Sequence, residues 1–162
     1  MTSAVVTGCA GFIGSHLTES LLEDGHAVVG VDCFNDNYRR EDKRANLEAA
    51  LAHDDFRLVP DDLVGADLPA LLAECDVVYH LAGEPGVRAS WGRRFDRYTH
   101  HNVAATQRLL EAARERSGLR VVYASSSSVY GSSAPLPAEE SAPVDPISPY
   151  GVSKLAAERY CV

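Results

Sequence analysis

The sequence predicts an α/β fold with a doubly wound, mostly parallel sheet. Short apolar runs typical of strands alternate along the chain with stretches of helical periodicity. The run AVVGV at 27–31 is apolar throughout, as expected of a parallel strand that helices cover on both faces. Glycine-rich or polar segments follow these runs, and ligands of such sheets bind beyond the carboxyl ends of the strands.

The individual elements follow from the same pattern. Strands are expected at 4–7, 27–31, 56–59, 77–81 and 119–124, and helices at 12–24, 45–52, 68–73 and 102–116. The first helix is expected to pack through one apolar face, made by Ile13, Leu17, Leu21 and Leu22. Gly25 ends that helix, and a final helix opens just after Pro149. Strands joined in this way imply right-handed crossovers.

Charge and composition argue against several classes of function. The formal charge is −8, from 23 acidic and 15 basic residues scattered along the chain, so nucleic acid and anionic membranes are unsuitable partners. No apolar run approaches the roughly 20 residues that span a bilayer, and the sequence enters a strand without a signal peptide. The four cysteines are widely spaced, which favours neither a disulfide framework nor a metal site and predicts a cytoplasmic location.

A glycine-rich loop follows the first predicted strand. GCAGFIG at 8–14 has the spacing GxxGxxG and leads from that strand into a helix. Closely spaced glycines let the backbone approach a pyrophosphate, whose charge meets unpaired N–H groups at the start of the helix. The dinucleotide fingerprint is GxGxxG, so the glycines alone are also compatible with an ordinary tight turn.

Asp32 favours dinucleotide binding over a simple turn. It stands at the end of the second predicted strand, about 20 residues after the glycines, where an acidic residue accepts hydrogen bonds from the adenosine ribose. A carboxylate at this position repels a 2′-phosphate, which favours NAD. The basic residues Arg39, Arg40 and Lys43 follow closely and leave NADP as the alternative.

A second motif, YGVSK, spans Tyr150 to Lys154. On a helix this spacing places both side chains on one face, where the ammonium favours an ionised phenol that can act as a base. An exposed helical pair is the alternative for an isolated YxxxK. Here a cluster of serines at 125–128 follows the fifth predicted strand and offers a hydroxyl to the same substrate oxygen.

Together these motifs resemble the extended short-chain dehydrogenase/reductase family, specifically its nucleotide-sugar epimerases and dehydratases. Further matching segments are DCFND, DDL, HLAG, NVAATQRLLEAA, VYASSSSVYG and SPYGVSK, and the resemblance covers the whole chain. It implies a Rossmann-type NAD-binding domain over residues 1–162. Members of the family continue well beyond YxxxK into a substrate domain, so we expect this chain to be a fragment, inactive and poorly stable alone, of a homodimeric enzyme.

The resemblance also implies roles for individual residues. Asp32 holds the ribose, Asp62 and Leu63 contact adenine, and Asn102 supports the sheet near the active site. The pyrophosphate is surrounded by Gly8, Gly11, Phe12, Ile13 and Gly14. The cofactor is further bordered by Leu81, Ala82 and Gly83. The catalytic residues are Ser126, Tyr150 and Lys154, of which Tyr150 and Lys154 also contact the cofactor.

The residues after Ser126 distinguish between the reactions of the family. Its 4,6-dehydratases carry TDEVYG, because eliminating water needs further acidic groups, and its UDP-glucuronate decarboxylases carry SEVYG. This chain has Ser127 and Ser128 in place of those carboxylates. The difference favours 4-epimerisation, with dehydration or decarboxylation as alternatives if another segment supplies the acid.

The expected substrate is UDP-glucuronate, which the enzyme would convert to UDP-galacturonate. The segments FNDNYRREDKRANL and AGEPGVRASW resemble UDP-glucuronate 4-epimerases more than UDP-galactose 4-epimerases. Substrate contacts are expected from Arg88, Ser126, Ser127, Ser128 and Tyr150, with a surface or ion-paired arginine as the alternative for Arg88. Glu84 is an argument against a second carboxylate nearby, so a UDP-glucose/galactose 4-epimerase stays an alternative. A non-catalytic dinucleotide-binding module is the alternative from a different class.

Overall fold

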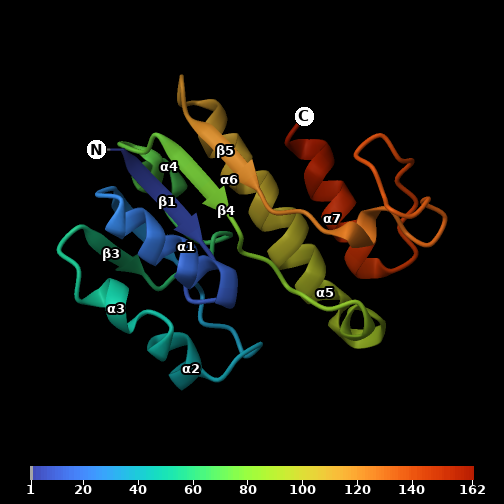
Figure 1. Cartoon of the computed structure of the whole chain (residues 1–162), viewed down its shortest axis with the longest axis horizontal. Helices are drawn as coiled ribbons and strands as arrows, with labels where there is room; N and C mark the ends of the chain where they lie inside the picture. The colour runs from blue at the N-terminus through green and yellow to red at the C-terminus, as the bar shows by residue number, and fades with distance from the viewer. Residues whose placement is uncertain (1) are drawn as a thin grey trace. The chain divides into compact units, whose positions relative to one another are not determined.

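The computed structural model describes residues 2–162 and contains a five-stranded, fully parallel sheet (Figure 1). The strands lie in the order β3-β2-β1-β4-β5. Their bounds are β1 Ser3–Thr7, β2 Ala27–Val31, β3 Phe56–Val59, β4 Val77–His80 and β5 Arg120–Tyr123. The expected α/β class and all five expected strands are therefore confirmed.

Within residues 2–162, seven α-helices and four other helical segments connect and follow the strands. The α-helices are α1 Phe12–Glu23, α2 Arg40–Ala45, α3 Glu48–Leu51, α4 Leu68–Leu72, α5 Phe95–Tyr98, α6 Ala105–Arg114 and α7 Pro149–Tyr160. The turns are η1 Arg88–Ser90, η2 Gly92–Arg94, the π-helical η3 Thr99–Ala104 and η4 Ser127–Val129.

The strand order reverses after β3, which is the feature that makes the sheet doubly wound. The chain moves outward from β1 through β2 to β3 and then returns to β4 on the other side of β1. Right-handed connections therefore place α1 and α3 on one face and α4 on the other. The carboxyl ends of β1 and β4, where the direction reverses, are the expected place for a ligand.

The core on the α1 face joins the central strands to α1 and α3. Ala4 and Val6 of β1, Leu21 and Leu22 of α1 and Leu47 before α3 are all buried in this core. Gly30 of β2 faces the Cys9 sulfur and the Phe56 ring, since a Cβ there would lie 2.7–2.8 Å from them. Close packing at that point holds the loop after β1 against the sheet.

The chain divides into two compact units. The first unit consists of the residues up to Ala82 together with Arg108–Ala124, and it contains the whole sheet. The second unit consists of Gly83–Gln107 and Ser125–Val162, which include α5, η3, η4 and α7.

Three expectations about helices need correction. Ile13 is 65% exposed, because it lies in the first turn of α1, beyond the point where β1 ends. Helix α2 was not expected, because its sequence REDKRA has no apolar face. The helix expected at 102–116 begins earlier, at α5, and passes through η3 without interruption. Short polar helices of this kind depend on tertiary partners, which apolar periodicity does not report.

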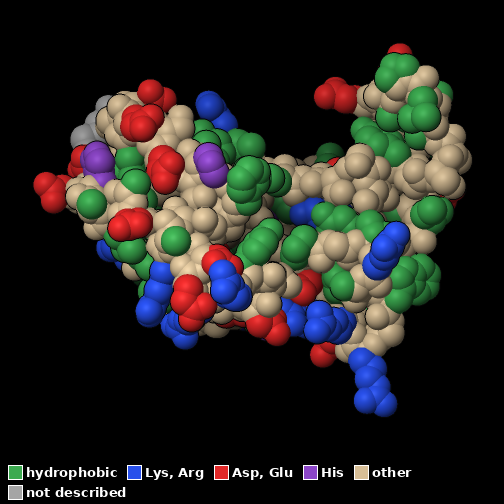
Figure 2. All heavy atoms as spheres, turned by 60° about the horizontal axis from the view of Figure 1, so that its bottom comes forward, with side chains coloured by type: hydrophobic (Ala, Val, Ile, Leu, Met, Phe, Trp, Pro, Cys, Tyr) green, Lys and Arg blue, Asp and Glu red, His purple; other side chains and the backbone are tan. Residues whose placement is uncertain are grey.

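The surface agrees with the scattered charge of the sequence. On the face drawn in Figure 2, acidic and basic side chains are interspersed. Among residues 2–162, no helix has both the length and the apolar character that crossing a bilayer requires.

Candidate functional site

In the first unit, the glycine loop leads directly into the amino end of α1. Gly11 is the N-cap residue and offers no side-chain acceptor to the first turn, which contains no acidic residue. Phe12 and Ile13 are exposed in that turn. The positive end of the helix dipole and its unpaired N–H groups are therefore available to an anion. These features fit a pyrophosphate.

Two of the predicted glycines are required by close approach. Gly8 has φ +72°, and a Cβ there would lie 2.9 Å from the backbone nitrogen of Ala82. A Cβ on Gly14 would overlap the carbonyl oxygen of Gly8. The loop is therefore packed against both the segment after β4 and its own helix, with room for a backbone but not for a side chain.

The predicted ribose residue, Asp32, is buried at the end of β2. Its Oδ2 accepts a hydrogen bond from the backbone N–H of Ala10 at 3.2 Å. Its Oδ1 accepts from the backbone N–H of Phe34 at 2.8 Å and from Lys43 Nζ at 2.9 Å. An ionised carboxylate offers about four acceptor positions, so these three bonds leave one for a ribose hydroxyl.

The three basic residues that kept NADP as an alternative cofactor each contact another side chain. Lys43 is buried and, besides Asp32, donates to Asn35 Oδ1 at 2.9 Å. Arg39 forms an exposed ion pair with Asp42 at 2.7 Å. Arg40 lies over the Phe34 ring, 5.7 Å from its centroid. Because Lys43 neutralises Asp32, the negative charge of Asp32 alone is a weaker argument against a 2′-phosphate than the sequence suggested.

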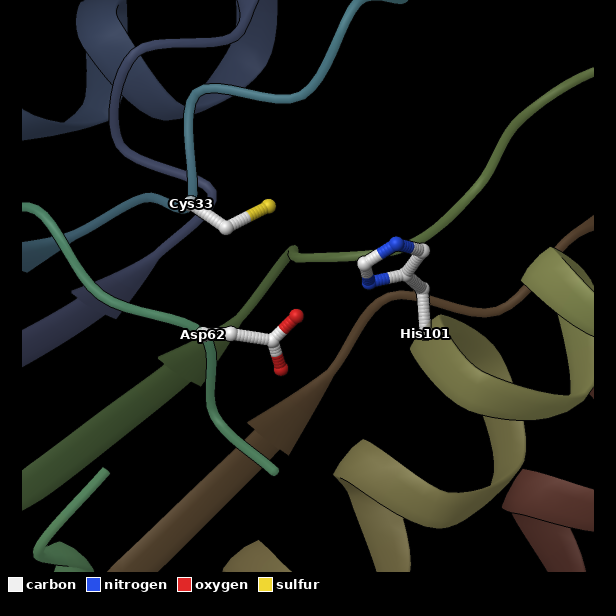
Figure 3. A group of neighbouring side chains, drawn as sticks. All are labelled: Cys33, Asp62 and His101. Atoms are coloured by element: carbon white, nitrogen blue, oxygen red, sulfur yellow. The ribbon is translucent and has the colours of Figure 1, made fainter. Parts of the chain in front are cut away.

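Asp62 follows β3 and lies close to Cys33, which follows β2. A carboxylate oxygen of Asp62 and the Sγ of Cys33 are within 4.8 Å of each other, and Figure 3 shows both side chains. Burial raises the pKa of the Cys33 thiol, and the Asp32 and Asp62 carboxylates raise it further. Asp62 accepts a hydrogen bond from the backbone N–H of Val64 at 2.8 Å. Leu63 is buried, so of the predicted adenine contacts only Asp62 is partly accessible.

Leu81 and Ala82 are fixed to the end of β1 through Thr7. The backbone N–H of Leu81 donates to the Thr7 carbonyl at 3.2 Å, and that of Ala82 to Thr7 Oγ1 at 3.1 Å. The Thr7 hydroxyl also lies 2.7 Å from Nδ1 of the buried His80. This network positions the two residues at the predicted ligand-binding end of the central strands.

The predicted catalytic residues all lie in the second unit. Ser126 is the N-cap residue of η4, and its Oγ accepts a hydrogen bond from the backbone N–H of Ser128 at 3.2 Å. A Cβ on Gly151 would lie 2.6 Å from the Ser128 carbonyl oxygen. The serine loop therefore packs tightly against the first turn of α7, beside Tyr150.

Helix α7 carries Tyr150 and Lys154 one turn apart. Ser148 Oγ caps the helix by accepting from the backbone N–H of Gly151 at 3.0 Å, and Pro149 occupies the first turn. The Tyr150 ring meets the buried Tyr98 ring edge to face, with 6.1 Å between centroids. Both the helix start and the tyrosine ring are thereby held in place.

Lys154 is a buried cation. Burial lowers its pKa to about 8. Its Nζ lies beside Gly83, 3.9 Å from the position a Cβ would take there, and Asn102 Oδ1 approaches the same position to 2.9 Å. A side chain at position 83 would collide with Asn102, so the glycine allows the loop after β4 to lie close to both residues.

The predicted substrate residue Arg88 is exposed in η1. Glu84, by contrast, is buried and paired with Arg97. The argument that Glu84 opposes a second carboxylate is therefore weakened, because a guanidinium neutralises it. The second unit contains the predicted residues Gly83, Arg88, Asn102, Ser126, Ser127, Ser128, Tyr150 and Lys154, and the first unit contains the others.

Sequence reasoning missed three side chains that hold this site. Lys43 was considered only as a cofactor discriminator, although it pairs with Asp32. Tyr98 precedes Asn102 by four residues and therefore lies on the same helical face, which was a usable signal. Ser153 donates to the Tyr150 carbonyl at 2.7 Å, a bond that serines within helices commonly make to the carbonyl three or four residues back, so its position was also a usable signal.

Comparison with known proteins finds similarity over nearly the whole chain. The sequence pattern of the NAD dependent epimerase/dehydratase family matches residues 4–162. An uncharacterized UDP-glucose epimerase of Bacillus subtilis, YtcB, is 48% identical over 158 residues, covering 97% of this chain and 50% of that protein. The UDP-glucose 4-epimerase of Mycolicibacterium smegmatis is 44% identical over 160 residues, covering 96% and 49%.

A solved structure shares the fold over nearly the whole chain. It is a UDP-glucuronic acid 4-epimerase from Bacillus cereus in complex with UDP-glucuronic acid and NAD. The TM-score is 0.92 at 42% identity, and the match covers 99% of this chain and 51% of that one. This chain thus spans about half the length of the curated relatives and the solved structure that it matches.

Proposed function

Because this chain belongs to the NAD dependent epimerase/dehydratase family, we propose that it is the cofactor-binding part of a nucleotide-sugar 4-epimerase. The reaction interconverts UDP-glucuronate and UDP-galacturonate through a 4-keto sugar. The observation that carries the proposal is α7, on which Tyr150 stands one turn before a buried Lys154 whose pKa is lowered to about 8. A phenol beside such an ammonium is suited to accept and return a proton near neutral pH.

NAD is the proposed cofactor, and it supplies a reversible hydride acceptor when bound. The exposed amino end of α1, with Gly8, Gly11 and Gly14, fits its pyrophosphate. The remaining acceptor position of Asp32 fits a ribose hydroxyl, and Asp62 is assigned to adenine. Lys154 is assigned to the nicotinamide ribose, and Phe12, Ile13, Leu63, Leu81, Ala82 and Gly83 are assigned to the remaining cofactor contacts.

The catalytic work of the chain is proton transfer at the sugar 4-hydroxyl. Tyr150 removes the proton, while Lys154 stabilises the resulting phenolate by its charge. Ser126 hydrogen-bonds the reacting oxygen and holds it against the tyrosine. When the 4-keto sugar is reduced on its other face, Tyr150 returns the proton, so the reaction consumes no net reductant.

The choice of 4-epimerisation rests on residues 127 and 128. Both are serines, so this segment offers no carboxylate for eliminating water or carbon dioxide. We assign Ser127, Ser128 and Arg88 to the sugar, where hydroxyls and a guanidinium suit a carboxylate. UDP-glucose/galactose 4-epimerisation is the second candidate, since the B. subtilis and M. smegmatis relatives are named for UDP-glucose.

Further proposals concern the protein as a whole. We propose that residues 1–162 act as one NAD-binding domain, and that the working enzyme is a cytoplasmic homodimer that binds neither nucleic acid nor membrane. The net charge of −8 argues against nucleic acid and anionic membranes as partners, and the four free cysteines support the cytoplasmic location. Light scattering of the purified product of the complete reading frame tests the dimer, and a monomeric mass contradicts it.

Replacing Tyr150 tests the proposed chemistry. In the product of the complete reading frame, Tyr150→Phe should abolish conversion of UDP-glucuronate and leave NAD affinity within about twofold, because only the hydroxyl is lost. Tyr160→Phe, at an exposed tyrosine of the same helix, should leave both unchanged. Chromatography of the products and NAD titration are the two measurements. Undiminished turnover in Tyr150→Phe would show that the base is elsewhere.

A further inference from the structure

A buried ion pair in the second unit has no part in the proton transfer described above. Glu84 Oε1 lies 3.3 Å from Arg97 Nε, and Oε2 lies 3.3 Å from Arg97 Nη2. The two oxygens thus face two different nitrogens of one guanidinium. The Glu84 side chain is 3% exposed and the Arg97 side chain is 24% exposed, so the pair is largely shielded from solvent. A two-pronged pair of this kind fixes orientation as well as distance.

The main chain of Glu84 is held by a second side chain, Asn102. The Glu84 backbone N–H donates to Asn102 Oδ1 at 2.6 Å, and Asn102 Nδ2 donates to the Glu84 carbonyl at 3.2 Å. Nδ2 uses its other proton on Ser153 Oγ, at 2.9 Å. Ser153 in turn donates to the Tyr150 carbonyl at 2.7 Å. A continuous set of hydrogen bonds therefore runs from Glu84 to the backbone of α7.

The neighbour of Arg97 provides a second connection to the same tyrosine. The Tyr98 hydroxyl lies 2.9 Å from the carbonyl oxygens of both Pro85 and Gly86, so its single proton is shared between the two residues after Glu84. The Tyr98 ring packs edge to face against the Tyr150 ring. Arg97 and Tyr98 together attach α5 to the segment that starts at Glu84.

We propose that Glu84, through its pair with Arg97, is a positioning residue for Tyr150. The pair sets how α5 meets the segment after β4, and Tyr98 and Asn102 transmit that arrangement to the ring and the backbone of Tyr150. Glu84 itself does not touch the reacting atoms. This inference rests on the proposed function for its kinetic consequence, but its structural consequence is independent of any substrate.

A purely stabilising role of the Glu84–Arg97 pair predicts a different result from a positioning role. Replacing both partners of a buried ion pair by apolar side chains of similar volume is often neutral or stabilising, whereas removing one partner is strongly destabilising. If the pair only stabilised the fold, an apolar double replacement would restore stability and turnover together. If the pair positions Tyr150, the same replacement restores stability but not turnover.

The test compares Glu84→Met, Arg97→Met and the double variant Glu84→Met/Arg97→Met in the product of the complete reading frame. We expect both single variants to lower the thermal midpoint and the double variant to regain most of it. In the double variant, kcat for UDP-glucuronate should fall about 10- to 100-fold, with KM within about twofold. The control Glu139→Gln, at an exposed glutamate, should leave the thermal midpoint and kcat unchanged. Recovery of kcat along with the midpoint overturns the inference.

A second readout does not depend on catalysis. With ring-¹³C tyrosine, the resonances of Tyr98 and Tyr150 are assigned from Tyr98→Phe and Tyr150→Phe spectra. The double variant should shift both resonances, and Glu139→Gln should shift neither. Unshifted resonances overturn the inference even if UDP-glucuronate is not the substrate. If wild-type protein converts no UDP-sugar while the resonances shift, the proposed function fails and the positioning role of Glu84 stands.

Discussion

At the scale of single residues, Asp32 shows how a ligand-binding carboxylate can also organise its own surroundings. It joins the glycine loop at Ala10, the segment after β2 at Phe34 and helix α2 at Lys43. Because these contacts use most of its acceptor capacity, its orientation is set before any ribose binds. The residue proposed to recognise the cofactor is thus fixed against the glycine loop, which is proposed to bind the pyrophosphate.

Replacing Lys43 should therefore weaken the fold. Lys43→Met leaves the buried Asp32 carboxylate without its cation, and we expect the free energy of unfolding to fall by about 3 kcal/mol. Urea unfolding measures the loss. Arg39→Met breaks the exposed pair with Asp42 and should change stability little, since solvent screens both charges. Equal effects of the two variants would refute the structural role of Lys43.

Lys154 should make stability depend on alkaline pH. Its pKa is lowered by burial from 10.5 to about 8, so between those values the unfolded chain binds more protons than the folded protein. The contribution of Lys154 to stability therefore rises as pH increases from about 8 to about 10.5. Relative to Lys154→Met, the wild type should gain on the order of 2 kcal/mol over this range.

Urea unfolding at pH 7.5, 9 and 10.5 measures this difference. Arg159→Met, at an exposed residue of the same helix, should leave the pH dependence of the wild type unchanged. If the difference in the free energy of unfolding between the wild type and Lys154→Met is the same at all three pH values, the pKa of Lys154 is not lowered by burial.

At the scale of elements, the glycine loop and α1 form one unit of local structure. Gly14→Ala places a methyl group onto the Gly8 carbonyl, so either the loop or the helix must move. We expect a loss of about 1–3 kcal/mol in stability and a marked loss of NAD affinity, because the first turn of α1 is displaced. Unfolding and NAD titration measure the two effects. Gly65→Ala, where the nearest atom to a new Cβ is at 3.8 Å, is the matched control.

The elements differ in how well the sequence predicted them. The strands and helices α1 and α7 were predicted within a few residues, because apolar runs, Gly25 and Pro149 mark them locally. Helices α2 and α5 escaped prediction, because they have only six and four residues and are held by ion pairs of Lys43 and Arg97 with residues outside these helices. An ion pair with a residue outside the helix leaves no periodic pattern in the sequence from which the helix could be predicted.

At the scale of the whole molecule, the order of the motifs along the sequence predicted the family and the fold, but it did not predict which side chains contact one another. The glycine loop, Asp32, the serines and YxxxK identified the family, and the alternation of strands and helices identified the parallel sheet. The partners that hold α7, such as Tyr98 and Asn102, come from a segment about 50 residues away that only folding brings to it. The prediction of which sugar is bound rests on still weaker signals, since relatives of similar sequence identity are named for UDP-glucose and UDP-glucuronate.

The most direct test of this account is a proton NMR time course. UDP-glucuronate and NAD⁺ are mixed with the product of the complete reading frame, and parallel samples contain UDP-glucose or the Tyr150→Phe protein. We expect the resonances of UDP-galacturonate to appear only in the wild-type sample with UDP-glucuronate, and to approach a constant ratio without net formation of NADH. Unchanged UDP-glucuronate together with conversion of UDP-glucose would contradict the proposed substrate, and no conversion of either sugar would contradict the proposed epimerase activity.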